Sequence, residues 1–210
     1  MPSVAPVSRP RLFLLDGPSS SGKTSIARAL QELCNRQVIH LVLDTAIAMM
    51  PHAFTGAGVH ADRGYRLVAG EDGVGAITRF IPGDLACKLD GQLAKFAAAL
   101  VADGFDVVFD QVVIDDATMA RLLAPLDMTT TYVVAVECDL QTLTAREQHR
   151  DDWAIGLARD QHRRVHGSNR LCDVTVNSGR CSAGDAAAEI LAYAAVTSPT
   201  AAARMAARHT

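Results

Sequence analysis

The chain has 210 residues, of which 49% are hydrophobic and 20% are charged, and its formal net charge is -3. This length suits one α/β domain with a sizeable core and is short for two domains. No apolar run approaches the length of a membrane-spanning helix, and the small negative charge argues against binding to a nucleic acid backbone, so we expect neither partner.

The N-terminal residues 1–10 read as a flexible, proline-containing lead-in. They lack a charged start followed by an apolar core, so we expect no secretion signal. The five cysteines are odd in number and form no C-x-x-C pair, which indicates a reducing cytoplasm rather than a disulfide framework or a zinc site. We expect a single domain over residues 11–196 and a C-terminal tail over residues 197–210.

Residues 17–24, with the sequence GPSSSGKT, fit the pattern G-x-x-x-x-G-K-[ST] at every required position. An apolar strand is expected before them, over residues 11–16, and a helix after them, to about residue 35. Gly17 and Gly22 allow the loop to curl so that its backbone N–H groups face an anion, and the helix adds its positive N-terminal end. The alternative is a Ser/Gly-rich connecting loop with a chance lysine, which the complete strand–loop–helix order disfavours.

This phosphate-binding loop predicts that the chain binds a nucleoside triphosphate. Lys23 is expected to reach the β- and γ-phosphates, and the Thr24 hydroxyl is expected to hold Mg²⁺. The predicted nucleotide-binding residues are Gly17, Ser19, Ser20, Ser21, Gly22, Lys23, Thr24 and Ser25.

A second apolar run, over residues 38–43, ends at Asp44. Continuous apolar character is typical of a parallel strand that is covered on both faces, and His40 within it is expected to be a packed residue. Asp44 would then lie at the carboxyl edge of the sheet, where its carboxylate could accept the proton of a hydroxyl that attacks the terminal phosphate. The alternative, compatible with the first, is that Asp44 caps a helix over residues 45–50.

Residues 52–82 form a long, irregular stretch that six glycines interrupt. The stretch is too long for a simple connector, so we expect it to be functional or mobile. In a nucleotide kinase architecture this position faces the acceptor substrate, and we therefore predict an acceptor-binding insertion. A disordered surface insertion is the alternative.

Residues 83–102 carry apolar side chains at three- and four-residue spacing, which predicts a helix. An apolar strand follows over residues 105–110 and ends in Asp110. After a phosphate-binding loop, such an aspartate commonly orients Mg²⁺ or its water shell, so Thr24 and Asp110 are the predicted metal ligands. The alternative for Asp110 is chance, because many strands end in an aspartate.

An arginine-rich segment over about residues 146–166 is predicted to form a lid over the phosphates. Arg146 and Arg150 are four residues apart, so they would share one helical face and stabilise the transferred charge. On the solvated face of the lid we expect arginines with acidic partners, namely Arg159, Arg163 and Arg164 with Glu147, Asp151, Asp152 and Asp160. Trp153 could pack under the lid or against a ligand.

Four further elements complete the predicted domain. They are a short helix over residues 116–124, a fourth strand over 131–138, a fifth strand over 173–177 and a covering helix over 183–195. In related architectures the loop after the fifth strand passes near the adenine.

Together these stretches resemble the chloramphenicol phosphotransferase-like kinases, which belong to the broader P-loop kinases that include the shikimate and adenylate kinases. The residues that carry the resemblance span nearly the whole chain: 17–25, Asp44 and Thr45 followed by Met50 and Pro51, the strand that ends in Asp110, Arg146 and Glu147 with Arg150, Gly156, Gln161, His166, and the strand with Asp173 and Val174. The resemblance implies a P-loop NTPase fold of the nucleotide and shikimate kinase type. In that fold a five-stranded parallel sheet of order 2-3-1-4-5 has helices on both faces.

The resemblance also implies a reaction, in which the γ-phosphate of ATP moves, with Mg²⁺ present, to an alcohol group on a small antibiotic. In this chain Asp44 matches the proposed general base of the family, Lys23 and Thr24 the phosphate and metal contacts, Asp110 an acidic site position, and Arg146 and Arg150 the lid arginines. Two positions depart from the family pattern. Trp153 stands where the family has a further arginine, and Gln111 stands where it tends to have a second acid.

Because of these departures, an antibiotic other than chloramphenicol stays open as the acceptor. Two other interpretations stay open as well: a metabolic kinase of a nucleoside, nucleotide or sugar acid, and a nucleotide-dependent binding or regulatory module that transfers no phosphate. The carboxylates of Asp44 and Asp110 favour a kinase, because a switch needs no base for an acceptor. The sequence leaves the oligomeric state undefined.

Overall fold

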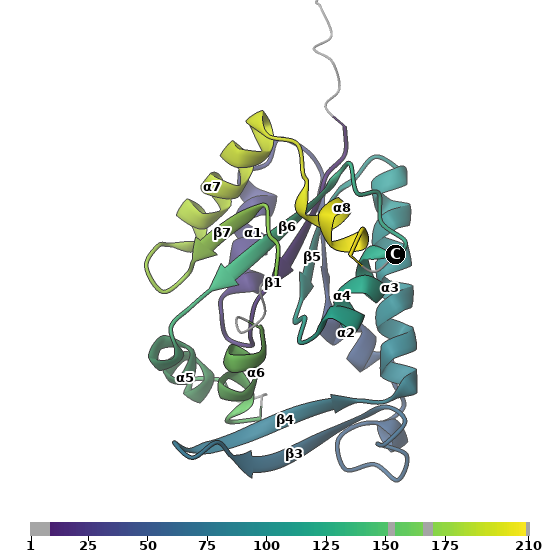
Figure 1. Cartoon of the computed structure of the whole chain (residues 1–210), viewed down its shortest axis with the longest axis vertical. Helices are drawn as coiled ribbons and strands as arrows, with labels where there is room; N and C mark the ends of the chain where they lie inside the picture. The colour runs from purple at the N-terminus through teal and green to yellow at the C-terminus, as the bar shows by residue number, and fades with distance from the viewer. Residues whose placement is uncertain (1–8, 151–153, 166–169, 209–210) are drawn as a thin grey trace, which may run out of the picture.

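The computed structural model describes residues 9–150, 154–165 and 170–208. Most of the expected lead-in lies outside these ranges, as do Asp151, Asp152, Trp153 and His166. Within them, a five-stranded sheet has helices on both faces, and a two-stranded hairpin lies apart from it (Figure 1). In this part of the chain, no helix has the length and apolar character needed to cross a bilayer.

The central sheet is parallel, with the strand order β2-β5-β1-β6-β7. Its strands are β1 (Leu12–Asp16), β2 (Val38–Val42), β5 (Asp106–Gln111), β6 (Thr131–Glu137) and β7 (Val174–Asn177). The labels differ from the expected order 2-3-1-4-5 because the hairpin strands β3 and β4 lie between β2 and β5 along the chain. Numbered without the hairpin, the sheet strands follow one another as 2-3-1-4-5. The strand that precedes the phosphate-binding loop is therefore the central one.

Helices cover both faces of the sheet, and Figure 1 shows the two groups on opposite sides. One group consists of α3 (Asp84–Ala102), α4 (Asp116–Leu123) and α8 (Ala201–Ala206), and the other of α1 (Lys23–Leu33) and α7 (Ala183–Val196). Apolar side chains on both faces explain why the strands have continuous apolar sequences rather than alternating ones.

Alternate side chains of β1 enter the two cores. Leu12 and Leu14 pack on the face covered by α3 and α4, whereas Phe13 and Leu15 pack on the face covered by α1 and α7. The expected C-terminal tail is not merely an appendage, because α8 buries Ala201, Ala202 and Met205 in the first of these cores.

The second part of the stretch from 52 to 82, residues 65–82, is a hairpin rather than a loose insertion. A short 3₁₀ helix, η1 (His52–Phe54), precedes the antiparallel strands β3 (Tyr65–Glu71) and β4 (Ala76–Pro82). Nearly every residue of β3 is exposed, so β3 lacks the alternation of buried and exposed residues from which strands are predicted. The hairpin lies below the sheet in Figure 1, next to α6 (Leu157–Val165).

Two more helices border the carboxyl edge of the sheet, namely α2 (Leu43–Ala48) after β2 and α5 (Leu140–Gln148) after β6. The side chain of Asp139 accepts a hydrogen bond from Thr142 N and so caps α5. Because α5 ends at Gln148, the prediction that Arg146 and Arg150 share one helical face is wrong.

Gly156 lies between α5 and α6, directly against strand β4 of the hairpin. Its φ is 91°, and a Cβ atom there would lie 2.9 Å from Ala76 O and from Thr78 N of β4. A larger residue would therefore meet backbone atoms that cannot turn aside, so only glycine lets α6 pack this closely on β4.

Candidate active site

A cavity of about 380 Å³ lies at the carboxyl edge of the central strands, where open α/β sheets bind ligands. It is bounded by the phosphate-binding loop, by α2, α3 and α4, by β4 of the hairpin, and by α5 and α6. The predicted site residues that line it are Ser19, Ser20, Gly22, Lys23, Thr24, Ser25, Asp44, Asp110, Arg146 and Arg150. Gly17 and Ser21 belong to the same loop without lining the cavity.

The phosphate-binding loop is curled. Ser20 and Gly22 have φ values of 63° and 85°, and Ser21 N donates to Pro18 O over 3.2 Å. The loop also presses against β6, since a Cβ atom on Gly17 would lie 2.6 Å from Val136 O. Helix α1 begins at Lys23, so the amide groups of its first turn have no intrahelical acceptors and border the cavity.

Three serine hydroxyls of this loop, those of Ser19, Ser20 and Ser21, are buried and have no hydrogen-bond partner among the described residues. Buried polar groups normally have partners, so orphaned hydroxyls beside unpaired helix amides fit a loop that accommodates a polar ligand. Oxyanions are the ligands that such a cradle binds.

The ammonium group of Lys23 is folded back onto its own loop. Its Nζ donates to Gly17 O over 2.9 Å and to Pro18 O over 3.0 Å, and it lies 3.7 Å from Asp110 Oδ1. The residue is 7% exposed. Its two hydrogen-bond acceptors are neutral carbonyls, which an anionic ligand in the loop can replace.

Asp110 lies next to Thr24, at the end of β5. The Thr24 hydroxyl donates to Asp110 Oδ2 over 3.1 Å. Burial by itself would raise the pKa of Asp110, but Lys23, His40 and Thr24 outweigh it and hold the pKa below its ordinary value. Asp110 is therefore ionised near neutral pH.

His40 approaches the same carboxylate from β2, with Nε2 3.6 Å from Asp110 Oδ2. Sequence reasoning predicted only a packed residue, and the side chain is indeed 13% exposed. Its position beside Asp110 follows from strand pairing, since β2 neighbours β5 in the sheet.

Asp44 is the second residue of α2 rather than the end of a strand, because β2 stops at Val42. The capping alternative is wrong: Val42 occupies the N-cap position, and no side chain caps this helix. Asp44 lines the cavity together with Lys23 and Asp110, at the carboxyl edge where it was expected.

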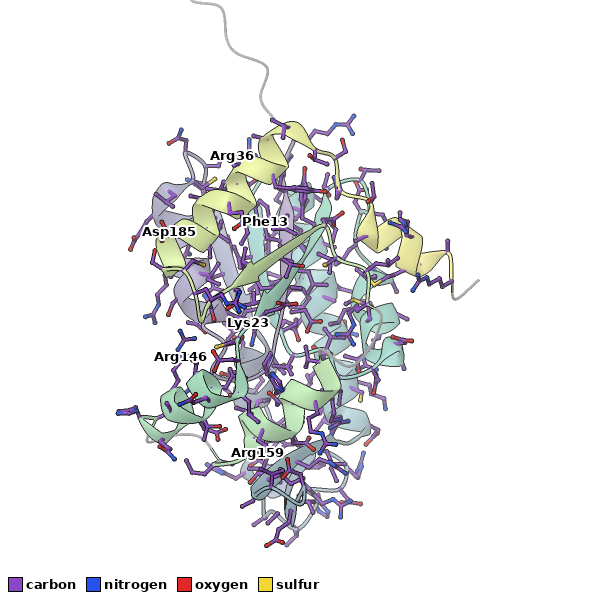
Figure 2. All side chains as sticks on the ribbon, turned by 60° about the vertical axis from the view of Figure 1, so that its left-hand side comes forward. Phe13, Lys23, Arg36, Arg146, Arg159 and Asp185 are labelled. Atoms are coloured by element: carbon purple, nitrogen blue, oxygen red, sulfur yellow. The ribbon has the colours of Figure 1, made fainter. Side chains whose placement is uncertain are left out.

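Arg146 connects α5 to the loop after β7 and to the phosphate-binding loop. Its guanidinium donates to Ser178 O over 2.8 Å and to Ser178 Oγ over 3.1 Å, and Ser178 Oγ in turn donates to Ser21 O over 2.6 Å. Figure 2 shows Arg146 near Lys23, whereas Arg159 lies lower, toward the hairpin. Arg150 follows α5 and lines the same cavity as Arg146.

The solvated lid face predicted for the acids is wrong at Glu147 and Asp160, which are 2% and 5% exposed. Glu147 accepts hydrogen bonds from Gly156 N over 2.7 Å and Ala158 N over 2.8 Å, and thus holds the start of α6. Asp160 pairs with Arg164 over 3.1 Å, and both residues line the cavity.

The acidic partner of Arg159 and Arg163 is a residue of the hairpin, Asp72, and not one of the predicted lid acids. Arg159 and Arg163 each lie 3.8 Å from Asp72 Oδ2, and Arg163 is 67% exposed. Asp72 also accepts hydrogen bonds from the backbone of Val74 and Gly75. The hairpin tip and α6 are thus joined by ion pairs.

Several residues of the site were assigned no role from sequence. Gln161 of α6 is buried and accepts a 2.7 Å hydrogen bond from Ser19 N, so it contacts the phosphate-binding loop directly. Gln111 is 1% exposed and lines the cavity, and its Nε2 has no partner in the described part of the chain. Asp90 and Arg121 form a further polar pair on the cavity wall.

Asp16, directly before the loop, is paired with Arg170, which also donates to Val113 O over 2.6 Å. Burial raises the pKa of Asp16, although Arg170 and the backbone N–H of Val113 act in the opposite direction. The sequence shows only that Asp16 ends a strand. It does not predict the partner, because Arg170 is distant along the chain.

Among the described residues, the phosphate-binding loop and the nearby acids are the candidates to hold Mg²⁺. Within these ranges, no three His, Cys, Asp or Glu side chains are grouped as a metal site. The predicted pair, Thr24 and Asp110, offers a hydroxyl and a carboxylate, the oxygen ligands that Mg²⁺ prefers together with water and phosphate. The residues therefore fit a metal that is held jointly with a nucleotide.

Many solved structures resemble the chain, among them three that match it over nearly its whole length. An unliganded sugar kinase from Janibacter sp. HTCC2649 has 13% sequence identity and a TM-score of 0.63, with 90% of this chain and 96% of that chain covered. The APS kinase of Mycobacterium tuberculosis in complex with AMPPNP and APS has 15% identity and a TM-score of 0.60, with 89% and 98% covered. A tunicamycin resistance protein of Deinococcus radiodurans has 13% identity and a TM-score of 0.56, with 91% and 99% covered. At these identities the likeness shows a shared fold.

No curated protein sequence matches the chain. The family model described as chloramphenicol phosphotransferase-like protein matches residues 10–195. Because that match spans most of the sequence, the chain belongs to the chloramphenicol phosphotransferase-like family and is a small-molecule kinase.

Proposed function

We propose that this kinase moves the γ-phosphate of ATP to a hydroxyl group of a small molecule, with an antibiotic as the leading class of acceptor. One observation carries the proposal: the phosphate-binding loop, Asp44, Asp110 and Arg150 line a single cavity. When a donor and an acceptor share one cavity, the reacting atoms can be held in line, which removes much of the entropic barrier to transfer.

The loop residues Gly17 and 19–25 are proposed to bind the phosphates of ATP. The curled backbone, the free first-turn amides of α1 and the orphaned serine hydroxyls support this assignment. Lys23 is proposed to exchange the carbonyls of Gly17 and Pro18 for phosphate oxygens. A charged oxygen is a stronger partner for an ammonium group than a neutral carbonyl, so the exchange favours the bound state.

Thr24 and Asp110 are proposed to hold Mg²⁺, directly or through water. A bound Mg²⁺ ion supplies charge neutralisation to the phosphates. The lowered pKa of Asp110 supports this role, because the carboxylate stays ionised at the pH where the ion binds.

Asp44 is proposed to act as the general base. It accepts the proton of the acceptor hydroxyl while the hydroxyl oxygen forms a bond to the γ-phosphorus, and the bond from that phosphorus to the bridging oxygen of ADP breaks. Arg150 and Arg146 are proposed to stabilise the charge on the transferred group. The packing of α6 and the hairpin around the cavity supports a role for both in excluding water.

The antibiotic class draws support from the family and from the likeness to a tunicamycin resistance protein. Phosphorylation adds negative charge and bulk to a drug hydroxyl, which is enough to spoil binding to the drug's target. A metabolic kinase of a nucleoside, nucleotide or sugar acid is the competing proposal for the acceptor.

The proposal is tested by incubating the chain with Mg-ATP and a panel of antibiotics, nucleosides and sugar acids, and searching for a phosphate-sized mass gain by mass spectrometry. We expect the gain on an antibiotic. A gain only on a metabolite would support the metabolic kinase, and no phosphorylated product from any antibiotic would defeat the proposed acceptor class. Lys23→Ala should damage nucleotide use whatever the acceptor.

The base assignment is tested by Asp44→Asn. We expect kcat to fall about 10²- to 10⁴-fold while the Kd for ATP stays nearly unchanged, because a base acts on the acceptor and not on the nucleotide. The matched control is Asp116→Asn, an exposed acid in the first turn of α4 that lies outside the cavity. Equal losses of turnover and ATP affinity in Asp44→Asn would defeat the assignment.

A further inference from the structure

The cavity has a second polar wall, away from the phosphate-binding loop, where α3 and α4 lie next to each other (Figure 1). Asp90 of α3 places Oδ2 3.6 Å from Nη2 of Arg121, and the same Nη2 donates to Thr118 Oγ1 over 3.2 Å. Asp90, Thr118 and Arg121 all line the cavity, and together they are called the α3–α4 corner below.

The α3–α4 corner has hydrogen-bonding capacity that the protein leaves unused. Asp90 Oδ1 and Arg121 Nε are both buried, and neither has a hydrogen-bond partner in the described ranges. Such atoms are rare in native structures because leaving them unpaired is costly. A polar group of a ligand in the cavity could form the hydrogen bonds that the described residues do not offer to these two atoms.

The surroundings hold the pair in place. The apolar residues Ala86 and Cys87 of α3 line the same cavity, so bulk water has limited access to Asp90, which is 6% exposed. The stem of Arg121 lies against Gly91, where a Cβ atom would lie 3.7 Å from the arginine Cγ. Burial raises the pKa of Asp90 to about 6 despite the nearby arginine.

The charges of the corner select the kind of group that it can receive. Asp90 and Arg121 are oppositely charged neighbours, so the carboxylate would repel an anion and the guanidinium would repel a cation. An uncharged group that donates to Asp90 Oδ1 and accepts from Arg121 Nε satisfies both orphaned atoms. A hydroxyl or an amide has this combination of donor and acceptor.

We propose that Asp90 and Arg121 are specificity-determining residues, which select an uncharged acceptor by binding a second hydroxyl or amide group, distinct from the hydroxyl that receives the phosphate. The inference rests on the proposed function, since it names the substrate class of the same site. It favours uncharged acceptors over sugar acids and nucleotides.

The test measures acceptor binding by calorimetry in the absence of nucleotide. The uncharged probes are hydroxyl compounds that include glucose and chloramphenicol. Chloramphenicol carries two hydroxyls and an amide. The anionic probes are gluconate and shikimate. We expect an uncharged probe to bind the wild type most tightly. Asp90→Asn and Arg121→Lys should each weaken that binding about 10-fold, since each removes one charge-assisted hydrogen bond.

The Kd for ATP, measured separately, should be the same in both variants as in the wild type, which a general structural defect would not allow. Asp84→Asn is the matched control, because Asp84 is a half-exposed acid on the same helix and forms its ion pair with Lys88 outside the cavity. Two variants at different residues keep the test valid if one of them fails to fold.

The proposal is overturned if Asp90→Asn and Arg121→Lys bind the uncharged probe as the wild type does, if gluconate or shikimate binds more tightly than every uncharged probe, or if no uncharged probe binds to protein that still binds ATP. Because nucleotide is absent, the outcome is separate from phosphate transfer. A wild type that binds chloramphenicol through the corner but phosphorylates nothing contradicts the proposed function and not the role of the corner.

Discussion

Replacing the buried carboxylate of Asp90 should make the free protein more stable. Burial raises the pKa of this carboxyl from 3.8 to about 6 in the folded state, so the folded protein binds the proton more tightly than the unfolded chain does. A group with a raised folded pKa contributes its full stability below the unfolded value and loses it as the pH rises through the folded value. At pH 8 the ionised Asp90 therefore carries a penalty that the neutral amide of the Asp90→Asn variant does not.

The magnitude follows from the pKa difference. About two pKa units, at about 1.4 kcal/mol each, give about 3 kcal/mol for Asp90→Asn at pH 8. The residue is only 6% exposed, so solvent screening removes little of this energy. The net figure already includes the attraction of Arg121, because that attraction opposes burial in setting the pKa.

The assay is urea unfolding of both proteins at pH 8, 6 and 4.5. We expect the free energy of unfolding of Asp90→Asn to exceed that of the wild type most at pH 8, and the excess to shrink as the pH falls. Asp84→Asn is a control of opposite sign, since its hydrogen bond with Lys88 is the main cause that holds the pKa of Asp84 below its ordinary value. A variant that is no more stable at pH 8, or whose gain is the same at every pH, would refute the reasoning.

Three more predictions concern the lid and the metal. Glu147→Ala should lower the free energy of unfolding by about 2–3 kcal/mol, because two backbone amides lose a buried charged acceptor. The control Glu189→Ala, at an exposed position, should change it by less than about 0.5 kcal/mol. Equal effects in urea unfolding would contradict the capping role of Glu147. Gly156→Ala should destabilise the protein by about 1–3 kcal/mol more than Gly104→Ala, since both glycines have positive φ but only Gly156 faces backbone atoms; a similar midpoint shift for the two would remove the steric argument. Asp110→Asn should raise the Mg²⁺ concentration for half-maximal activity about 10-fold, and a loss of kcat with unchanged Mg²⁺ dependence would speak against a metal ligand.

The parts of the fold that follow from local sequence could be predicted. The phosphate-binding loop is a contiguous motif, β1 and β5 each contain a run of apolar residues, and α3 shows a helical period. Each of them was therefore identifiable without its partners. The meeting of Lys23 and Asp110 in one cavity follows as well, because parallel strands deliver their ends to the same edge.

The rest depends on contacts that no local pattern records. Asp90 and Arg121 are 31 residues apart, on two helices whose relative rotation is set by packing against the sheet. Glutamate is usually exposed to solvent, so the sequence predicts a solvated Glu147. The turn of the chain at Gly156 instead brings two backbone amides to its carboxylate. β3 is exposed along nearly its whole length, so its sequence lacks the alternation of apolar and polar residues that predicts a strand.

The hydrogen bond from Ser19 N to Gln161 has a thermodynamic consequence. A phosphate that takes this amide must displace the side chain of Gln161. Gln161 belongs to the helix that packs on β4, and Phe80 and Pro82 of β4 line the same cavity. If nucleotide and acceptor bind as proposed, occupancy of the two positions is linked through one N–H group. Linkage is reciprocal, so whatever factor nucleotide imposes on acceptor affinity, acceptor must impose equally on nucleotide affinity.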